Sequence, residues 1–464
     1  MIPMTLPEIA DVVGGTVHDD TGVTVSGPAF IDSRVAHSDG LFVAVAGERV
    51  DGHDYARTAV DAGAAAVLAQ RPVGVPAVVV DDVMAALAAL ARHVVAALPH
   101  LTVVALTGSQ GKTSTKDLLA QVLARAGRTV ATFGSFNNEL GMPVTALRAD
   151  ADTRFLVLEM GARGIGHIRE LCEIAPPHVG LVLNVGKAHL GEFGSQEAIA
   201  QAKGELVEAV RPGGTAVLNA DDPLVSAMAA RTGERVLTFG ESARADVRVE
   251  GLTTDAMTRA SFDLVTAEGR APVSLRGLGE HQAGNAAAAA TVGLAVGMPL
   301  DLVARALSEA DHVSRWRMEV HERADGVTVV NDAYNANPDS MRAALKSLAE
   351  IGRARPEGRT VAVLGEMREL GASATEEHDA VGRLAVRLDI HQLVVVGEPA
   401  RPIHLGACLE GSWGGESVFV DDNDAALAWL REHLGAGDVV LLKASRAAAL
   451  ERVADALLEE ENTR

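Results

Sequence analysis

The sequence is poor in cysteine, aromatic residues and positive charge, and each shortage narrows the class of protein. Its 464 residues include two cysteines, Cys172 and Cys408, which lie too far apart for a metal-ligand spacing. We expect both to be reduced thiols in protein cores. Aromatic residues make up 3% of the chain, so alanine, valine and leucine must fill its cores. A formal net charge of −21 argues against nucleic acid as a partner, because nucleic-acid binding requires clustered lysine and arginine.

Apolar runs long enough to span a membrane are also scarce, and we expect no leader sequence. The stretch 83–98 is interrupted by Arg92 and His93 and is shorter than the roughly 20 apolar residues of a membrane span. The stretch 283–300 is rich in alanine and glycine and contains Asn285. We expect both to be buried helices, and no membrane insertion. No basic segment followed by an apolar core opens the chain, so we expect no signal peptide and a cytoplasmic location.

The pattern of apolar segments predicts three α/β domains, at 1–98, 99–312 and 313–464. The first mixes helices with short strands, and a helix at 83–98 ends it. The second repeats strand, turn and helix, which predicts a mostly parallel sheet with helices on both faces. The third is a smaller doubly wound domain closed by a helix from 447 to about 460. The predicted strands are 30–34, 41–47, 64–70, 101–106, 154–159, 178–184, 215–219, 327–332, 360–365, 392–397, 417–420 and 438–443.

The segment TGSQGKTS, at 107–114, is the most informative in the chain. It lies between a predicted strand and a predicted helix at 116–125, so its backbone N–H groups and the helix dipole could bind phosphates. Lys112 could then reach the β- and γ-phosphates, and the Thr113 hydroxyl could hold Mg²⁺. The usual glycine spacing is not met, so the segment is either a chance match or a shortened phosphate loop. Its predicted cofactor-binding residues are Gly108, Ser109, Gln110, Gly111, Lys112, Thr113 and Ser114.

Polar residues of the central block follow the carboxyl ends of predicted strands, where ligands bind in open α/β sheets. Glu159 could hold Mg²⁺ or be a solvated strand end, and His189 could be a ligand or a surface-loop histidine. From its spacing alone, Lys203 is a solvated lysine in the middle of a helix. Two further groups have structural alternatives as turns or caps that the residues alone leave open: Asn137 with Asn138, and Asn219 with Asp221 and Asp222.

The third block carries a second polar cluster, NDAYNANPDS at 331–340. Asp339 or Ser340 could cap a helix running on from Met341. The remaining polar side chains, those of Asp332, Tyr334, Asn335 and Asn337, exceed what a cap needs. Lys443 and Arg446 place two cations at another strand end, which suits an anionic substrate or is a solvated pair. Facing sites on consecutive domains predict chemistry in the cleft between them.

Together these motifs resemble those of the Mur ligase family, the ATP-dependent amide-forming enzymes of peptidoglycan precursor synthesis. The resemblance spans the chain in order, and the shortened phosphate loop is the family's own form. AYNANP and the N-terminal DSR and DGH are similar to the members that add D-alanyl-D-alanine to UDP-MurNAc-tripeptide. The matching segments are DSR, LFVAVAGERVDGHDY, TGSQGKTS, NNELGMP, LEMGA, NVGKAHLGEFGS, AKGEL, LNADDP, GEHQAGNAAAAA, NDAYNANPDS, VLGEMRELG and LLKASR.

The resemblance implies a UDP-sugar-binding first domain, an ATP- and Mg²⁺-binding central domain and a Rossmann-like third domain. Lys203 matches a lysine that reacts with CO₂ to give a carbamate, so Thr113, Glu159, His189 and Lys203 are the implied metal ligands. The implied catalytic residues are Lys112, Lys203 and His189, and Asn285 and Asp332 match positions near adenine and ribose. The implied substrate-binding residues are Ser33, Arg34, Asn137, Asn138, Arg315, Asn335, Asn337, Lys443 and Arg446.

Two positions depart from the family pattern. The segment GARGIG, at 161–166, stands where relatives often read G-A-N-H-x-G, so no role can be carried over to Arg163 or Gly164. Ala444 replaces the glycine of the frequent K-G-S-R motif. Two rival functions are a nucleotide-gated binding protein and a folylpolyglutamate-type ligase. The polar third block argues against the first and the N-terminal motifs against the second. We expect a monomer.

Overall fold

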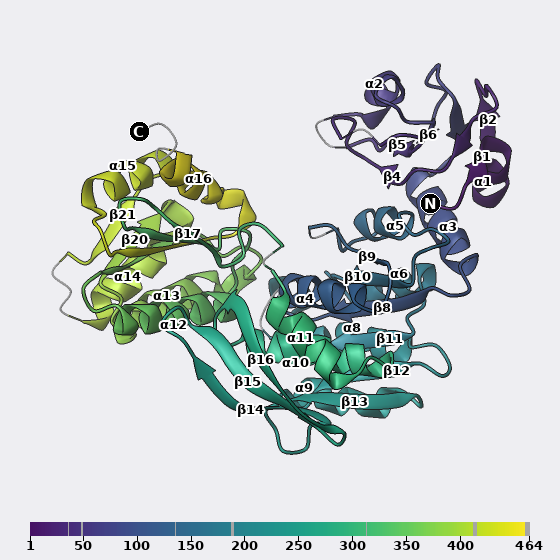
Figure 1. Ribbon diagram of the computed structural model, residues 1–464. Coiled ribbons are helices and arrows are strands. Elements are labelled where there is room, and N and C mark those ends of the chain that lie inside the picture. Colours follow the sequence, from purple (N-terminus) through teal and green to yellow (C-terminus); the bar gives the residue numbers. More distant parts are fainter. Residues whose placement is uncertain are drawn as a thin grey trace.

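The computed structural model describes residues 1–35, 37–47, 50–134, 136–186, 190–311, 313–411 and 415–459. The chain folds into three successive α/β domains, each built around its own main sheet (Figure 1). The strands of these sheets lie within 16–79, 102–278 and 319–443. The predicted three-domain α/β fold is confirmed. The predicted domain ends at 98 and 312 agree with the gaps between the sheets and stay predictions.

The N-terminal domain has a five-stranded sheet in the order β2-β7-β6-β5-β4, in which β2 alone is antiparallel to its neighbour. The strand predicted at 30–34 keeps only its first residue. The Asp32 side chain accepts a hydrogen bond from the backbone N–H of Arg34 at 3.0 Å, which turns the chain there. The elements are β1 (Met4–Thr5), α1 (Leu6–Val13), β2 (Thr16–His18), β3 (Thr24–Val25), β4 (Ala29–Phe30), β5 (Leu41–Val43), α2 (Ala56–Asp61), β6 (Ala66–Ala69), β7 (Ala77–Val79) and α3 (Val83–Ala96).

The central domain has a nine-stranded sheet in the order β16-β15-β14-β13-β12-β11-β8-β10-β9. Strands β8 to β14 pair in parallel, as predicted, and β14 to β16 form an antiparallel extension that the sequence analysis did not predict. The strands are β8 (Thr102–Thr107), β9 (Thr129–Ala131), β10 (Phe155–Glu159), β11 (Val179–Val182), β12 (Thr215–Asn219), β13 (Arg235–Gly240), β14 (Val247–Thr254), β15 (Arg259–Thr266) and β16 (Gly269–Leu278).

The helices of the central domain cover both faces of this sheet. On one face, α4, α10 and α11 pack together, and on the other α5, α6 and α8 pack with α3. That second face shares one apolar core with the N-terminal domain, including Leu6, Leu41 and Leu68. The helices are α4 (Lys112–Ala124), α5 (Gly141–Ala146), α6 (His167–Ile174), α7 (Leu190–Phe193), α8 (Gln196–Glu208), α9 (Pro223–Ser226), α10 (Gln282–Ala295) and α11 (Leu300–Glu309).

The C-terminal domain has a six-stranded sheet in the order β17-β18-β22-β19-β20-β21, parallel except for β17. Its two faces have separate apolar cores. The predicted strands are all present, and β17 is an addition. The elements are β17 (Glu319–Glu322), β18 (Thr328–Asn331), α12 (Pro338–Ala354), β19 (Thr360–Leu364), α13 (Ala374–Arg387), β20 (Gln392–Val396), α14 (Arg401–Glu410), β21 (Ser417–Val420), α15 (Asn423–His433), β22 (Val439–Lys443) and α16 (Glu451–Glu459).

The two most apolar stretches form α3 and α10, as predicted. Asp82 begins α3 as its N-cap, accepting hydrogen bonds from the backbone N–H groups of Met84 and Ala85. Within the described ranges, no helix is both long enough and apolar enough to cross a bilayer. The two cysteines differ: Cys172 is buried, which raises its pKa to about 12. Cys408 is exposed on α14, so its predicted place in a core was wrong.

Candidate active site

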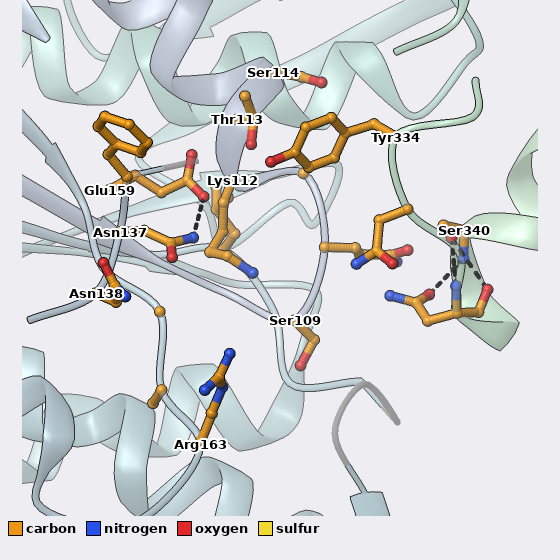
Figure 2. Close-up of a pocket in the computed structure, with 18 of the residues that line it drawn as sticks. Ser109, Lys112, Thr113, Ser114, Asn137, Asn138, Glu159, Arg163, Tyr334 and Ser340 are labelled. Carbon is orange, nitrogen blue, oxygen red and sulfur yellow. Dashed lines mark hydrogen bonds between the residues drawn. The ribbon is translucent and has the colours of Figure 1, made fainter. Parts of the chain in front are cut away.

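A cavity of about 1350 Å³ lies where the carboxyl ends of the central strands face the C-terminal domain (Figure 2). All three domains contribute to its lining, the N-terminal domain through Ile31 and α3. The volume exceeds the roughly 300–1000 Å³ of a typical small-molecule pocket, so the cavity has room for more than one substrate. The lining includes Ser109, Lys112, Thr113, Asn137, Asn138, Glu159, Arg163, Lys203, Asn285, Arg317, Asp332, Asn335, Asn337, Lys443 and Arg446.

The phosphate loop joins β8 to α4, which begins at Lys112 and not at the predicted 116. Asn184, just beyond β11, fixes the shape of the phosphate loop through two hydrogen bonds. The Asn184 Oδ1 accepts hydrogen bonds from the backbone N–H groups of Ser109 at 3.0 Å and Gln110 at 2.9 Å. The Lys112 Nζ donates to the backbone oxygen of Gly108 at 2.8 Å. The loop thus combines a lysine with the N-terminus of a helix, which is an anion-binding arrangement.

Gly111 is the position where this loop requires glycine. Its φ is +76°, and a Cβ there would lie 2.5 Å from the Asn285 Oδ1. Gly111→Ala should weaken ATP binding about tenfold or more, since the strained backbone and the displaced Asn285 both deform the loop. Titration calorimetry with ATP would measure this loss. Gly213, with φ +78° and nothing within 4 Å of a built Cβ, is the matched control. An equal loss of affinity in Gly213→Ala would contradict the prediction.

Glu159 is the buried acid of the site, at the end of β10 and 1% exposed. Its Oε1 accepts a hydrogen bond from the Asn137 Nδ2 at 2.8 Å. Its Oε2 is buried without a hydrogen-bond partner in the part of the chain that the structure describes. An unpartnered buried carboxylate oxygen is costly, so the site fits a bound cation. The interpretation of Glu159 as a solvated strand end was wrong.

Lys203 is also buried, at 5% exposure, although its spacing alone indicated a solvated lysine. It lies in α8 and lines the cavity. Its amine has no hydrogen bond or ion pair among the described residues. Burial lowers the pKa of Lys203 well below its usual range, and the nearby positive charge of Lys112 lowers it further. His189, the other predicted ligand, lies outside the described residues, so its role stays a prediction.

The pKa of Lys112 itself is set by opposing effects. Burial lowers the pKa of Lys112, the Glu159 carboxylate raises it, and the Arg317 guanidinium lowers it. These three charged side chains therefore act on one another across the cavity. A triphosphate placed among them would add negative charge and favour the charged form of Lys112.

The C-terminal domain brings Asp332, Asn335 and Lys443 together. The Lys443 Nζ donates to the Asp332 Oδ2 at 2.6 Å and to the backbone oxygen of Asn335 at 2.9 Å. His281, at the start of α10, faces this pair from the central domain. Burial lowers the pKa of His281, while Asp332 raises it and Lys443 lowers it. Asp332 and Lys443 therefore lie where the C-terminal domain meets the central domain, and their predicted roles with ribose and substrate stay predictions.

Asn337 and Arg446 line the cavity but also have local partners. Asn337 is the N-cap of α12 and accepts a hydrogen bond from the Ser340 backbone N–H at 2.9 Å. The helix starts at Pro338, so the predicted cap at Asp339 or Ser340 was wrong. The Arg446 guanidinium is paired with Glu451, and its Cζ lies 4.5 Å from the centre of the Trp316 ring.

Arg317, and not the predicted Arg315, reaches the cavity. The Arg317 Cζ lies 4.2 Å from the centre of the Tyr334 ring, and its Nε is buried without a hydrogen bond among the described residues. Arg315 is exposed, and its charge lowers the pKa of Asp455 against the larger effect of burial. Residues i and i+2 of an extended strand point to the same face, but Trp316 between the two arginines has a φ of +60°, so Arg315 and Arg317 do not share one face. The resemblance implied Arg315 alone, and the sequence analysis did not name Arg317.

The two residues of the N-terminal domain that were predicted to bind the UDP-sugar, Ser33 and Arg34, do not line the cavity. Arg34 is exposed and pairs with Asp32, its Nη2 lying 2.7 Å from the Asp32 Oδ2. Hydrogen bonds from Arg34 lower the pKa of Asp32 to about 2. Neither Ser33 nor Arg34 is among the described residues that line the cavity, whereas their neighbour Ile31 is. A role for Ser33 and Arg34 in holding a UDP-sugar stays a prediction.

Several polar residues with open alternatives turn out to hold loops together. The Asn138 Oδ1 accepts a hydrogen bond from the Gly141 backbone N–H at 2.9 Å, although Asn138 also lines the cavity. Asp222 caps α9 and accepts from the Val185 N–H at 2.8 Å. Asn219 donates to the Leu183 backbone oxygen at 2.8 Å. Asp221 accepts hydrogen bonds from the backbone N–H groups of Glu241 and Ser242. The cap interpretation therefore holds for the LNADDP segment.

Three family models match consecutive parts of the chain. They are described as Mur ligase family, catalytic domain, at 29–99, Mur ligase middle domain, at 106–293, and Mur ligase, glutamate ligase domain, at 316–446. A UDP-N-acetylmuramoyl-tripeptide–D-alanyl-D-alanine ligase of Mycobacterium tuberculosis is 51% identical over 99% of both chains.

Solved structures agree with these matches. A MurF ligase of Thermotoga maritima in complex with ADP is 31% identical, with a TM-score of 0.79 over 95% of this chain and 99% of that one. A UDP-N-acetylmuramoylalanyl-D-glutamyl-2,6-diaminopimelate–D-alanyl-D-alanyl ligase of Acinetobacter baumannii is 30% identical, with a TM-score of 0.84 over 98% of both chains.

Proposed function

Because this chain belongs to the Mur ligase family, we propose that it joins D-alanyl-D-alanine to UDP-MurNAc-tripeptide with ATP, which forms the pentapeptide precursor of peptidoglycan. The observation that carries this proposal is the cavity shared by the three domains. It places a phosphate loop, a buried acid and cations from two domains around one space. This set suits the transfer of a phosphoryl group between two anionic substrates.

The chemistry begins with activation, because a free carboxylate is a poor acyl donor. The γ-phosphoryl group of ATP moves to the terminal carboxylate of the tripeptide, which gives an acyl phosphate and ADP. The amine of D-alanyl-D-alanine then attacks the acyl carbon, phosphate leaves, and an amide forms with loss of a proton. Positioning and charge neutralisation supply most of the rate enhancement in such transfers. Lys112, Arg317 and the N–H groups of the phosphate loop are placed to neutralise the phosphates.

Mg²⁺ fits the part of the cavity around the buried Glu159. There it would be held by Thr113, Glu159, His189 and a carbamylated Lys203. A plain ammonium at Lys203 would repel a metal, and the described residues contain no ready-made cluster of three acidic, histidine or cysteine ligands. Only an unprotonated amine reacts with CO₂, and the buried Lys203, with its lowered pKa and no anionic partner in the described part of the chain, suits that reaction. The bound metal would supply further neutralisation of phosphate charge.

An acyl phosphate is destroyed by water, so the C-terminal domain is expected to cover the site during reaction. Two close approaches between the domains support this. A Cβ on Gly186, beyond β11, would lie 2.5 Å from the Asp339 Oδ2 of α12. A Cβ on Gly191, in α7, would lie 2.8 Å from the backbone nitrogen of Gly371. Both glycines allow the two domains to meet, and Gly186 does so next to the phosphate loop, because its N–H donates to the Ser109 Oγ at 2.9 Å. We also propose a monomer that acts in the cytoplasm, where ATP and UDP-linked precursors are available.

Phosphate release by the purified protein tests the proposal. With ATP and Mg²⁺, release should require both UDP-MurNAc-tripeptide and D-alanyl-D-alanine, and mass spectrometry should find one pentapeptide product per phosphate. Omitting either substrate is the matched control. Release of phosphate without D-alanyl-D-alanine at the full rate, or no pentapeptide with both substrates present, would exclude this function.

A further inference from the structure

Arg163 lines the cavity and belongs to the loop between β10 and α6, directly after the buried acid Glu159. Its side chain extends from this loop into the cavity (Figure 2). Among the described lysines and arginines of the lining, only Arg163 and Lys203 have no hydrogen bond, ion pair or ring contact from the side chain. The reaction proposed above gives Lys203 a role and leaves Arg163 without one.

The loop that carries Arg163 is held by a buried carboxylate. The side chain of Glu205, in α8, has no exposed surface. Its Oε1 accepts a hydrogen bond from the Gly166 backbone N–H at 2.6 Å, and its Oε2 accepts from the Arg169 backbone N–H at 3.1 Å. At the start of the loop, the Gly161 N–H donates a hydrogen bond to the backbone oxygen of Asn137 at 2.8 Å. Arg163 is therefore presented on a fixed loop.

The loop that carries Arg163 lies on the face of the sheet opposite the one that α4 covers, which favours the acyl substrate over the nucleotide as its ligand. Asn285, which approaches the phosphate loop at Gly111, belongs to α10 on the face of the sheet that α4 covers. The loop of Arg163 runs into α6 on the opposite face, where α6 packs with α3. The cavity continues on that side along His167 and Glu170 of α6 and Met84 and Arg92 of α3. The helix α3 leads from the N-terminal domain, where the UDP end of the substrate is expected.

We propose that Arg163 binds a carboxylate of the peptide arm of UDP-MurNAc-tripeptide, other than the carboxylate that is phosphorylated, with Glu205 as the positioning residue of its loop. This inference rests on the proposed function. A planar guanidinium binds a carboxylate through two parallel hydrogen bonds, which fixes orientation as well as charge. The name of the Acinetobacter baumannii ligase includes D-glutamyl and diaminopimelate residues, and each of these keeps one carboxyl group that the chain and the reaction do not use.

Steady-state kinetics of Arg163→Gln would test the proposal. The KM for UDP-MurNAc-tripeptide should rise roughly 10- to 100-fold, the loss expected for a charge-assisted hydrogen bond. The KM values for ATP and D-alanyl-D-alanine should stay within about twofold, because the residue does not act on them. Arg163→Lys should lie between the wild type and Arg163→Gln, since it keeps the charge without the paired N–H groups. Arg211→Gln, which removes an exposed arginine of the central domain that does not line the cavity and does not contact Glu205, is the control.

Two substrates distinguish the source of the carboxylate. A lysine-containing tripeptide offers only the D-glutamyl carboxylate, and a diaminopimelate-containing tripeptide offers both. A rise in KM with both substrates assigns the D-glutamyl group, and a rise with diaminopimelate alone assigns that residue. Glu205→Gln should also raise the KM for the tripeptide. It should add little in the Arg163→Gln background if it acts through Arg163.

Three outcomes would overturn the inference. They are an unchanged KM for the tripeptide in Arg163→Gln, an equal rise in the KM for ATP, and recovery of Arg163→Gln by added bicarbonate. The second would place the residue at the phosphates and the third at Lys203. Each of these requires a wild type that ligates normally, so they differ from a failure of the proposed function, in which the wild type forms no pentapeptide.

Discussion

Lys203→Ala should lower kcat about a thousandfold or more, because it removes a group that is expected to become a negatively charged metal ligand. The buried position of Lys203, without an anionic partner among the described residues, is what would make this lysine reactive toward CO₂. The measurement is pentapeptide formation at saturating substrates. Lys203→Glu should recover part of the rate, and short carboxylates such as formate or acetate added to Lys203→Ala should recover part as well.

The control for this variant is Lys346→Ala. Lys346 is an exposed lysine of α12 that does not line the cavity, so its removal should leave kcat within about twofold. Thermal unfolding of both variants separates a loss of fold from a loss of chemistry. Full activity of Lys203→Ala would remove the carbamate from the mechanism. No rescue by any carboxylate, in a variant that unfolds at the wild-type temperature, would also count against it.

Lys112→Met should also lower kcat/KM for ATP about a thousandfold, since methionine keeps most of the side-chain volume and removes the charge at the phosphate loop. In the structure the Lys112 Nζ lies 2.8 Å from the backbone oxygen of Gly108, at the start of α4. Both ATP binding and turnover should suffer, because the same charge acts on the bound triphosphate and on the transferred group. Calorimetry and initial rates measure the two effects separately.

Lys346→Met is the matched substitution for this second experiment. A Lys112→Met enzyme within about tenfold of the wild type would show that the loop N–H groups and other cations neutralise the phosphates without the lysine. The mechanism proposed above would then need Arg317, whose charge also acts on Lys112, as the main cation.

Much of the site could be predicted because its residues stand in short sequence segments that directly follow predicted strands. Strand ends and glycine-rich turns are visible in the residues, and parallel strands bring their carboxyl ends to one edge. This is how Lys112, Glu159 and Lys443 were found, and each lines the cavity. The resemblance added Lys203, whose burial follows from the packing of α8 in the core of the central domain. Spacing alone could not reveal that packing.

The errors come from features that the residues do not display. Arg315 was named and Arg317 was not, whereas Arg317 lines the cavity and Arg315 is exposed, on either side of the left-handed backbone at Trp316. The antiparallel strands β14 to β16 were not foreseen, although β15 and β16 alternate buried and exposed residues in the usual way. The cap of α12 was placed too late because Asn337 and Pro338 were read only as a ligand segment.

The shared apolar core of the first two domains has a mechanical consequence. Leu6, Leu41 and Leu68 pack in the same core as α3, α5, α6 and α8, so the N-terminal and central domains cannot separate without exposing that core to water. The C-terminal domain has its own two cores, and among the described residues Met257 and Leu278 are the ones by which these cores reach the central domain. The first two domains should therefore behave as one cooperative unit of unfolding, and a swing of the third domain should require far less free energy.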